Sequence, residues 1–274
     1  MEGIERGELD EAGQSWAVQA NWEALAAHLA REHDGWFEEL HGLVRFSTGL
    51  HSGFLNGVLR ATLAPRAVKG AVTLNRHVFG PDLPWRWIVG PHSTPETLDL
   101  DLERLGLERR WVGMTGMAID LDALDDRDWM PAGASVTEVT DRDGLEAWLS
   151  VRQRNLELDE QTTDAWRTAH GRPGHGDDKP LRHFVGWLGE DAVAGSTLFL
   201  GAGVAGIYHV DTVAEARGKG FGKAVTIAAL RAAKDLGYRW GVLSASSLGL
   251  PVYRRLGFVD SGVYTILVGG PANA

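Results

Sequence analysis

The stretch YHVDTVAEARGKGFGKAV, residues 208–225, tells more about this chain than any other segment of its 274 residues. It begins as an apolar, β-branched run, breaks into a basic glycine turn and continues with the apolar period of a helix. One stripe of that helix is expected to comprise Phe221, Val225, Ala228, Ala232 and Leu236. A strand, a glycine turn and a helix in this order are typical of an anion site, because the first helical turn presents unpaired N–H groups.

The glycine turn suits a pyrophosphate group. The absence of side chains at Gly218, Gly220 and Gly222 lets phosphate oxygens approach the backbone, and three cations add positive charge: Arg217, Lys219 and Lys223. The spacing excludes a Walker loop, because no Ser or Thr follows Lys223. It also excludes a dinucleotide fingerprint, because a lysine stands three residues after Gly220. What remains is Arg-x-x-Gly-x-Gly, with a purely connecting turn as the alternative.

This pattern resembles the acyl-CoA motif of the GCN5-related N-acetyltransferase (GNAT) family, Gln/Arg-x-x-Gly-x-Gly/Ala after a strand. A second stretch, residues 244–258, resembles the family's other signature, a short helix that ends in Tyr-x-x-x-Gly-Phe. It lies between two expected strands, 240–245 and 259–268. The two motifs follow one another in the family's order, which makes the resemblance specific.

The resemblance implies the GNAT acyl-CoA N-acyltransferase fold, an α/β (α+β) fold built on a sheet of mixed parallel and antiparallel strands. It also implies acetyl-CoA or another acyl-CoA as cofactor. It implies that Tyr253 donates a proton to the departing thiolate, whereas a packed core aromatic is the alternative. Ser246 stands where many members carry an asparagine that contacts the cofactor, so this departure leaves the contact open. The implied cofactor-binding residues are Val210, Asp211, Thr212, Arg217, Gly218, Lys219, Gly220, Phe221, Gly222, Lys223 and Ser246.

The base that deprotonates the amine is not assigned by the resemblance. Some members carry a glutamate ten residues before the motif arginine, where this chain has Ile207. The remaining candidates are Asp211, His209, Glu157 or a chain of waters. The polar segment 159–180 lies where the family places its substrate-binding segment, and a solvated loop is the alternative.

The expected function is an acetyl-CoA-dependent N-acetyltransferase in which an amine attacks the thioester directly. The acceptor is a small-molecule or peptide amine whose identity the sequence does not give. One alternative is a non-catalytic acyl-CoA-binding or regulatory protein, which the missing glutamate permits. The other is a different acyl-CoA reaction on the same fold, such as decarboxylation.

Composition excludes several other classes. A net charge of −10 and a pI near 5.5 argue against nucleic acid or an acidic membrane surface as partner. No run of 18 apolar residues occurs and the N-terminus lacks a signal-peptide pattern, so we expect a cytoplasmic protein. The absence of cysteine excludes disulfides and thiolate sites, and the ten scattered histidines predict no metal site. A homodimer is compatible with the sequence, which does not decide the oligomeric state.

The length predicts more than one domain of about 150 residues. Five aspartates crowd residues 120–128 and run into a Pro- and Gly-containing stretch, which reads as a linker. We therefore predict an N-terminal lobe at 1–125, a linker at 126–134 and a catalytic domain at 135–274. Beyond the linker the pattern predicts one strand, two helices, three strands, the glycine-turn helix, then strand, helix and strand.

The first lobe resembles a second copy of the same module. Leu102 to Gly106 precedes a strand as Tyr253 to Gly257 does, at an offset of 151 residues. This copy has Leu102 in place of the tyrosine and lacks Arg-x-x-Gly-x-Gly, so we predict tandem GNAT-like lobes with a degenerate first copy. Chance similarity is the alternative. Trp85 and Trp87 share one strand face, as expected of a core or lobe interface.

Overall fold

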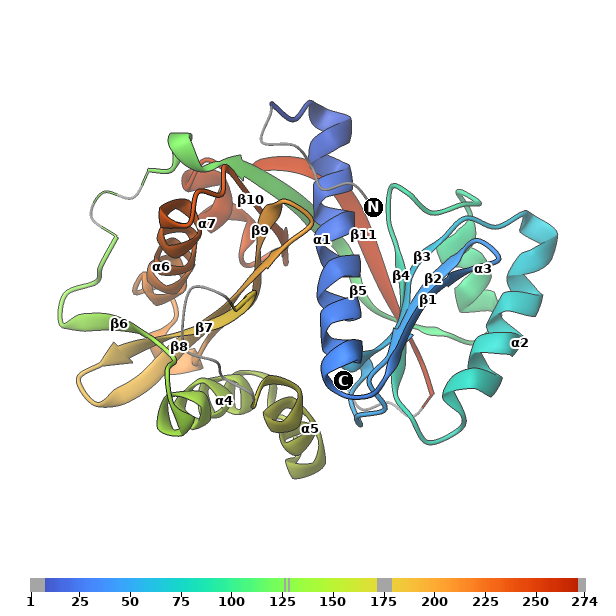
Figure 1. The fold of residues 1–274 in the computed structure, drawn as a ribbon, viewed down its shortest axis with the longest axis horizontal. Coiled ribbons are helices and arrows are strands. Elements are labelled where there is room, and N and C mark those ends of the chain that lie inside the picture. Colours follow the sequence, from blue (N-terminus) through green and yellow to red (C-terminus); the bar gives the residue numbers. More distant parts are fainter. Residues whose placement is uncertain (1–7, 126, 128, 172–178, 271–274) are drawn as a thin grey trace. The chain divides into compact units, whose positions relative to one another are not determined.

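A computed structural model of the chain describes residues 8–125, 127, 129–171 and 179–270. Its contacts divide the chain into two compact units with a mixed α/β architecture (Figure 1). Unit 1 comprises Met1–Asn21 and Gly116–Ser261, and unit 2 comprises Trp22–Thr115 and Gly262–Ala274. Three elements contribute residues to both units: α1 (Glu11–Glu32), β5 (Glu108–Asp120) and β11 (Val259–Gly269).

The sheet of unit 1 has the strand order β5-β10-β9-β8-β7-β6. Its strands beyond β5 are β6 (Ala134–Glu138), β7 (Leu181–Leu188), β8 (Asp191–Gly201), β9 (Val204–Thr212) and β10 (Trp240–Ala245). Strands β6 to β9 pair antiparallel in succession, and β9 pairs with β10 in parallel. A short 3₁₀ turn follows β5 (Leu121–Ala123) and another follows β9 (Ala214–Ala216). The predicted element order from residue 135 onward is thus confirmed.

Carboxylate caps start two helices of unit 1. The Asp141 side chain accepts a 2.8 Å bond from Gly144 N and begins α4 (Arg142–Leu156). Asp159 does the same for α5 (Glu160–His170), accepting from Thr162 N at 2.7 Å. The expected loop at 159–180 is therefore helical in its first half, and its residues 172–178 lie outside the described residues.

Helix α6 (Phe221–Asp235) and the pair α4–α5 cover opposite faces of β7 to β9 (Figure 1). The buried face of α6 is broader than the predicted stripe. Phe221 and Val225 are buried as expected, but Ala228 and Ala232 lie at the edge of that face. Its centre is formed by Ala224, Ile227 and Leu230, because the helix packs across three strands. The short helix α7 (Leu250–Arg255) follows β10.

Unit 2 contains β1 (Trp36–Leu40), β2 (Leu43–Ser47), β3 (Asn56–Ala61) and β4 (Trp85–Val89), with helices α2 (Val68–Phe79) and α3 (Leu98–Arg104) and 3₁₀ turns at Gly53–Leu55 and Pro65–Ala67. Strands β1, β2 and β3 pair antiparallel, β3 and β4 pair parallel, and β4 pairs antiparallel with β11. Trp85 and Trp87 are fully buried in its core beside Phe79 and Leu102. They are therefore core residues.

One order of elements occurs twice along the chain, starting at β3 and again at β9. Both times, a strand, a 3₁₀ turn, a helix, a strand, a helix and a strand follow one another. The division of the chain nevertheless differs from the predicted 1–125, 126–134 and 135–274. Residues 1–21 group with unit 1, and the residues of β11 from Gly262 group with unit 2, where Gly269 pairs with Trp85. Among the helices that the structure describes, none has the length and apolar character needed to cross a bilayer.

Candidate functional site

Strands β9 and β10 separate before either ends. Their ladder joins Ala205, Gly206 and Ile207 to Gly241, Val242 and Leu243, whereas β9 continues to Thr212 and β10 to Ala245. On the other side of β9 the register with β8 shifts between Gly195 and Thr197, which pair with Asp211 and Tyr208. His209 and Val210 thus form a bulge opposite Ser196, and such bulges bend a strand and redirect its side chains. The backbone of Val210 to Thr212 therefore lies beyond the end of the β9–β10 ladder.

His209 has a strained backbone at this bulge. Its φ of +50° lies in the left-handed region, which is uncommon for a residue other than glycine. The side chain is partly exposed, and its ring meets the Trp166 ring edge-on with centroids 4.7 Å apart. Strain of this kind persists where the surrounding structure enforces it, and it is common at functional sites.

The N-terminus of α6 forms the predicted glycine turn. Gly218 and Gly220 have φ values of +73° and +91°, which strain any other residue, and no described side chain caps the helix. A Cβ on Gly222 would lie 3.2 Å from Thr212 Oγ1, so the glycine allows β9 and α6 to approach closely. The N–H groups of the first turn thus remain available to an anion, and Lys219 is exposed beside them. The residues present therefore fit a pyrophosphate group.

Arg217 is tied into the protein at the edge of this turn. Its guanidinium donates to Thr212 O at 3.2 Å and to Asn155 Oδ1 at 2.8 Å. Asn155 in turn donates to Asp211 Oδ1 at 2.7 Å, and Arg152 donates to Asp211 Oδ2 at 2.7 Å. A polar chain therefore runs from the glycine turn through α4 to the splayed end of β9.

The pair Arg152–Asp211 is almost completely buried, with 3% and 6% of the two residues exposed. The Arg152 guanidinium carbon lies 3.8 Å from the centre of the Trp166 ring. Burial lowers the pKa of Arg152, and the Asp211 charge opposes that shift. Because Asp211 accepts from two donors, one of them a buried cation, it is a structural anion rather than a poised base. Glu157, another sequence-based candidate, is exposed where α4 ends.

Histidines far apart in the sequence gather on the α4–α5 face of the sheet. The rings of His170 and His183 lie 5.0 Å apart, and those of His170 and His209 lie 5.6 Å apart. Thr197 Oγ1 lies 2.9 Å from His183 Nδ1 and 3.4 Å from His209 Nδ1. Burial, with a smaller effect of Arg152, lowers the pKa of His183 from 6.5 to about 3, so this imidazole is neutral at physiological pH. Across the described ranges, no group of three potential ligands is arranged to hold a metal ion.

Tyr253 lies on α7 and is 8% exposed. Burial raises the pKa of its phenol above the ordinary 10.0, a hydrogen bond with Thr226 lowers it, and the Asp211 charge raises it further. The phenol is therefore protonated at neutral pH and is able to donate. Thr226 also donates to Gly222 O at 2.8 Å, which connects the Tyr253 environment to the first turn of α6.

The remaining predicted residues lie near this region. Ser246 is exposed in the loop between β10 and α7, where its hydroxyl accepts a long 3.4 Å bond from Gly249 N. Lys223 is partly exposed in the first turn of α6. Their contacts with a cofactor stay predictions. Three further residues of this region, Arg152, Asn155 and Thr197, carry no signal in the sequence, because their link to β9 depends on tertiary packing.

Comparison with known proteins matches residues 144–258 to the model of the Acetyltransferase (GNAT) family. The structure is similar to a GCN5-related N-acetyltransferase from Kribbella flavida, with a TM-score of 0.71, 19% identity and coverage of 92% of this chain and 96% of that one. It is also similar to a GCN5-related N-acetyltransferase from Sphaerobacter thermophilus, with a TM-score of 0.56, 17% identity and coverage of 97% and 96%.

A third similar structure is a tandem GNAT protein from the clavulanic acid biosynthesis pathway, with a TM-score of 0.54, 16% identity and coverage of 93% and 96%. A search of curated proteins finds no match. These likenesses show that the chain has the fold of GNAT acyltransferases, and the matched segment contains both sequence motifs and most of unit 1.

Proposed function

We propose that the chain is an acetyl-CoA-dependent N-acetyltransferase whose reaction takes place in unit 1. The observation that carries the proposal is the opening between β9 and β10 beyond Ile207, next to the uncapped N-terminus of α6. Bound acetyl-CoA would supply an activated acetyl thioester. The matched family segment covers these elements, which supports the same assignment.

The protein would hold the cofactor mainly through its backbone. The first N–H groups of α6, at Phe221, Gly222 and Lys223, suit the pyrophosphate, and Lys219 adds positive charge. The N–H groups of Val210 and Thr212 suit the pantetheine arm and the developing oxyanion, since they lie beyond the β9–β10 ladder. Tethering of Arg217 to Asn155 and Thr212 O stabilises the turn that joins these two regions.

Two side chains would handle protons. Tyr253 donates to the departing thiolate, since its raised pKa keeps the phenol protonated. His209 accepts the proton of the attacking amine. The choice of His209 rests on its place in the bulge and its partly exposed ring, whereas Asp211 is held by Arg152 and Asn155.

Unit 2 is, in this proposal, a degenerate copy whose cofactor slot is closed by the chain itself. The β3–β4 ladder joins Gly57 to Arg86 and Val58 to Trp87, although β3 continues to Ala61. At that end Thr94 pairs with the chain beyond β3 in place of a β4 residue. Thr94 N donates to Ala61 O at 2.8 Å, and Leu63 N donates to Thr94 O at 3.1 Å.

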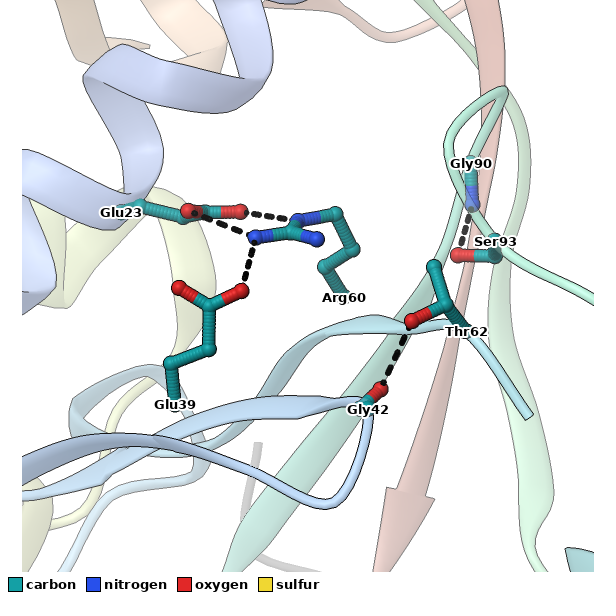
Figure 2. Close-up of polar contacts among 7 residues, drawn as sticks. All are labelled: Glu23, Glu39, Gly42, Arg60, Thr62, Gly90 and Ser93. Atoms are coloured by element: carbon teal, nitrogen blue, oxygen red, sulfur yellow. Dashed lines mark hydrogen bonds and ion pairs between the residues drawn. The ribbon is translucent and has the colours of Figure 1, made fainter. Parts of the chain in front are cut away.

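Other polar contacts secure the same end of β3. Arg60 donates to Glu23 at 2.8 Å and to Glu39 at 3.1 Å. Figure 2 shows these contacts and the bond from the Thr62 hydroxyl to Gly42 O. In addition, Leu102 is fully buried where unit 1 has Tyr253. These features support the binding of one cofactor per chain.

The proposal is tested by thiol release from acetyl-CoA with a panel of amines, amino acids and aminoglycosides, and by mass spectrometry of the products. We expect release that depends on an amine, an acetylated product, and one bound CoA per chain by calorimetry. Tight CoA binding without turnover on any acceptor would favour a regulatory acyl-CoA-binding protein. Loss of malonyl-CoA without release of free CoA thiol would favour decarboxylation.

A further inference from the structure

Thr197 links two histidines across three neighbouring strands. His183 on β7 is its direct cross-strand partner, and His209 lies in the β9 bulge on its other side. The Thr197 residue is fully buried, and its hydroxyl oxygen lies 2.9 Å from His183 Nδ1 and 3.4 Å from His209 Nδ1. The same nitrogen of each ring thus faces one shared hydroxyl.

A threonine hydroxyl carries one proton, so it donates to one imidazole and accepts from the other. The pKa of His183 near 3 keeps that ring neutral, so one of its nitrogens is always an acceptor. If His209 gains a proton at Nε2, both of its nitrogens carry protons and Nδ1 must donate to Thr197. Thr197 then donates to His183 Nδ1. With the hydrogen bonds in this direction, from His209 Nδ1 to Thr197 and from Thr197 to His183 Nδ1, His209 can gain or lose the Nε2 proton while the Thr197 hydroxyl keeps its orientation.

The surroundings hold the His209 ring in one orientation. Its backbone is in the left-handed region, and the rings of Trp166 and Trp148 lie 4.7 and 6.1 Å away. Among the described residues, titratable and charged groups of this cluster come from every element packed against it: His170 from α5, Arg152 from α4, His183 from β7, and Tyr208 and Asp211 from β9 itself. The Arg152 and Asp211 charges are paired with each other, which limits their net effect on the ring.

We propose that Thr197, supported by neutral His183, is a positioning residue that keeps the His209 proton on Nδ1 and makes Nε2 the proton-accepting atom. The inference rests on the proposed function, in which His209 is the base. In the step it serves, the amine nitrogen would bond to the acetyl carbon as the bond from that carbon to sulfur breaks with its electron pair on sulfur. Tyr253 would protonate the departing thiolate, and the proton of the amine nitrogen would move to His209 Nε2. The protons on His209 Nδ1 and on the Thr197 hydroxyl stay where they are, so no proton passes along the chain.

The test compares Thr197→Val, which keeps the side-chain shape without the hydroxyl, with Thr197→Ser, which keeps the hydroxyl. Ser196→Ala is the matched control, because that hydroxyl donates to Val225 O on the α6 side of the same strand. Nitrogen-15 NMR of the labelled full chain reads the His209 tautomer, with His209→Gln used to assign the signal. Turnover is followed as kcat and KM across pH.

We expect the Nδ1–H tautomer in the wild type, in Thr197→Ser and in Ser196→Ala, and a shift toward Nε2–H in Thr197→Val. The valine variant should lose about tenfold in kcat with little change in the KM for acetyl-CoA, and serine should restore it. An Nε2–H tautomer in the wild type, or a valine variant with unchanged tautomer, would overturn the inference. Absence of acetyl transfer would instead contradict the proposed function, while the NMR result still decides the tautomer.

Discussion

Removal of one partner from the buried pair Arg152–Asp211 should be among the most destabilising single changes in unit 1. The two residues are 3% and 6% exposed, and their charged atoms lie 2.7 Å apart. Arg152→Met keeps an unbranched stem but leaves the Asp211 carboxylate buried with Asn155 as its remaining described donor. Asp211→Asn leaves the guanidinium buried over Trp166 without its anion. Each change should lower the free energy of unfolding by about 3–5 kcal/mol.

The double variant Arg152→Met/Asp211→Asn removes both charges together. It should cost about as much as one single change, so the interaction energy of the cycle should be about 3 kcal/mol or more. Urea unfolding followed by tryptophan fluorescence is a suitable assay, because Arg152 lies over the Trp166 ring and Trp148 packs against Trp166.

The control is the Arg167–Glu146 pair, which joins α5 to α4 at 2.8 Å with both side chains more than a third exposed. Its cycle should give an interaction energy of at most about 1 kcal/mol. If the losses from Arg152→Met and Asp211→Asn simply add, the two buried charges make no net interaction, contrary to this prediction.

Three further predictions concern the proposed proton donor, the anion site and the buried histidine. Tyr253→Phe should lower kcat about 10²-fold and leave acetyl-CoA affinity unchanged, because the ring stays and Thr226 keeps its bond to Gly222 O; wild-type turnover would reduce Tyr253 to a packing residue. Lys219→Glu should weaken acetyl-CoA binding about tenfold by calorimetry. Lys69→Glu makes the same charge change in the first turn of α2 and should have no effect; equal losses in both variants would contradict a site confined to α6. Burial lowers the pKa of His183 from 6.5 to about 3, so the unfolded chain takes up that proton first and stability falls as the pH drops below 6.5. His183→Gln keeps an acceptor for Thr197 and should reduce this loss of stability by about 1.4 kcal/mol per pH unit. Identical shifts of the urea midpoint between pH 7 and pH 5 in the wild type and in His183→Gln would contradict the lowered pKa of His183.

Local patterns in the sequence were sufficient to predict the elements of unit 1. The strand Trp240–Ala245 is confirmed as predicted, and α4 begins at Asp141, a residue type that is favoured as a helix cap. Periodicity and caps act over a few residues, so they can be read directly from the chain. The turn at Gly218 to Gly222 was predicted for the same reason, although Gly222 also serves the contact with Thr212.

Features that depend on tertiary pairing could not be predicted in this way. The alternation in β11 shows that it is a strand, but not that its residues from Gly262 pair with β4 in unit 2. The histidines looked scattered because 26 residues separate His183 from His209, and only the β8 pairing brings both to Thr197. Likewise, the structural role of Asp211 depends on its ion pair with Arg152, a residue that α4 brings against the end of β9.

Hydrogen–deuterium exchange of the full chain with and without acetyl-CoA tests whether the cofactor binds between β9 and the N-terminus of α6. We expect the cofactor to slow exchange at Val210 to Thr212 and in the first turn of α6, at Phe221 to Lys223. We expect no change in the first turn of α2 or at Leu63, whose N–H already donates to Thr94 O. Protection centred on α2 and the end of β3, or none in unit 1 at saturating acetyl-CoA, would contradict this placement of the cofactor.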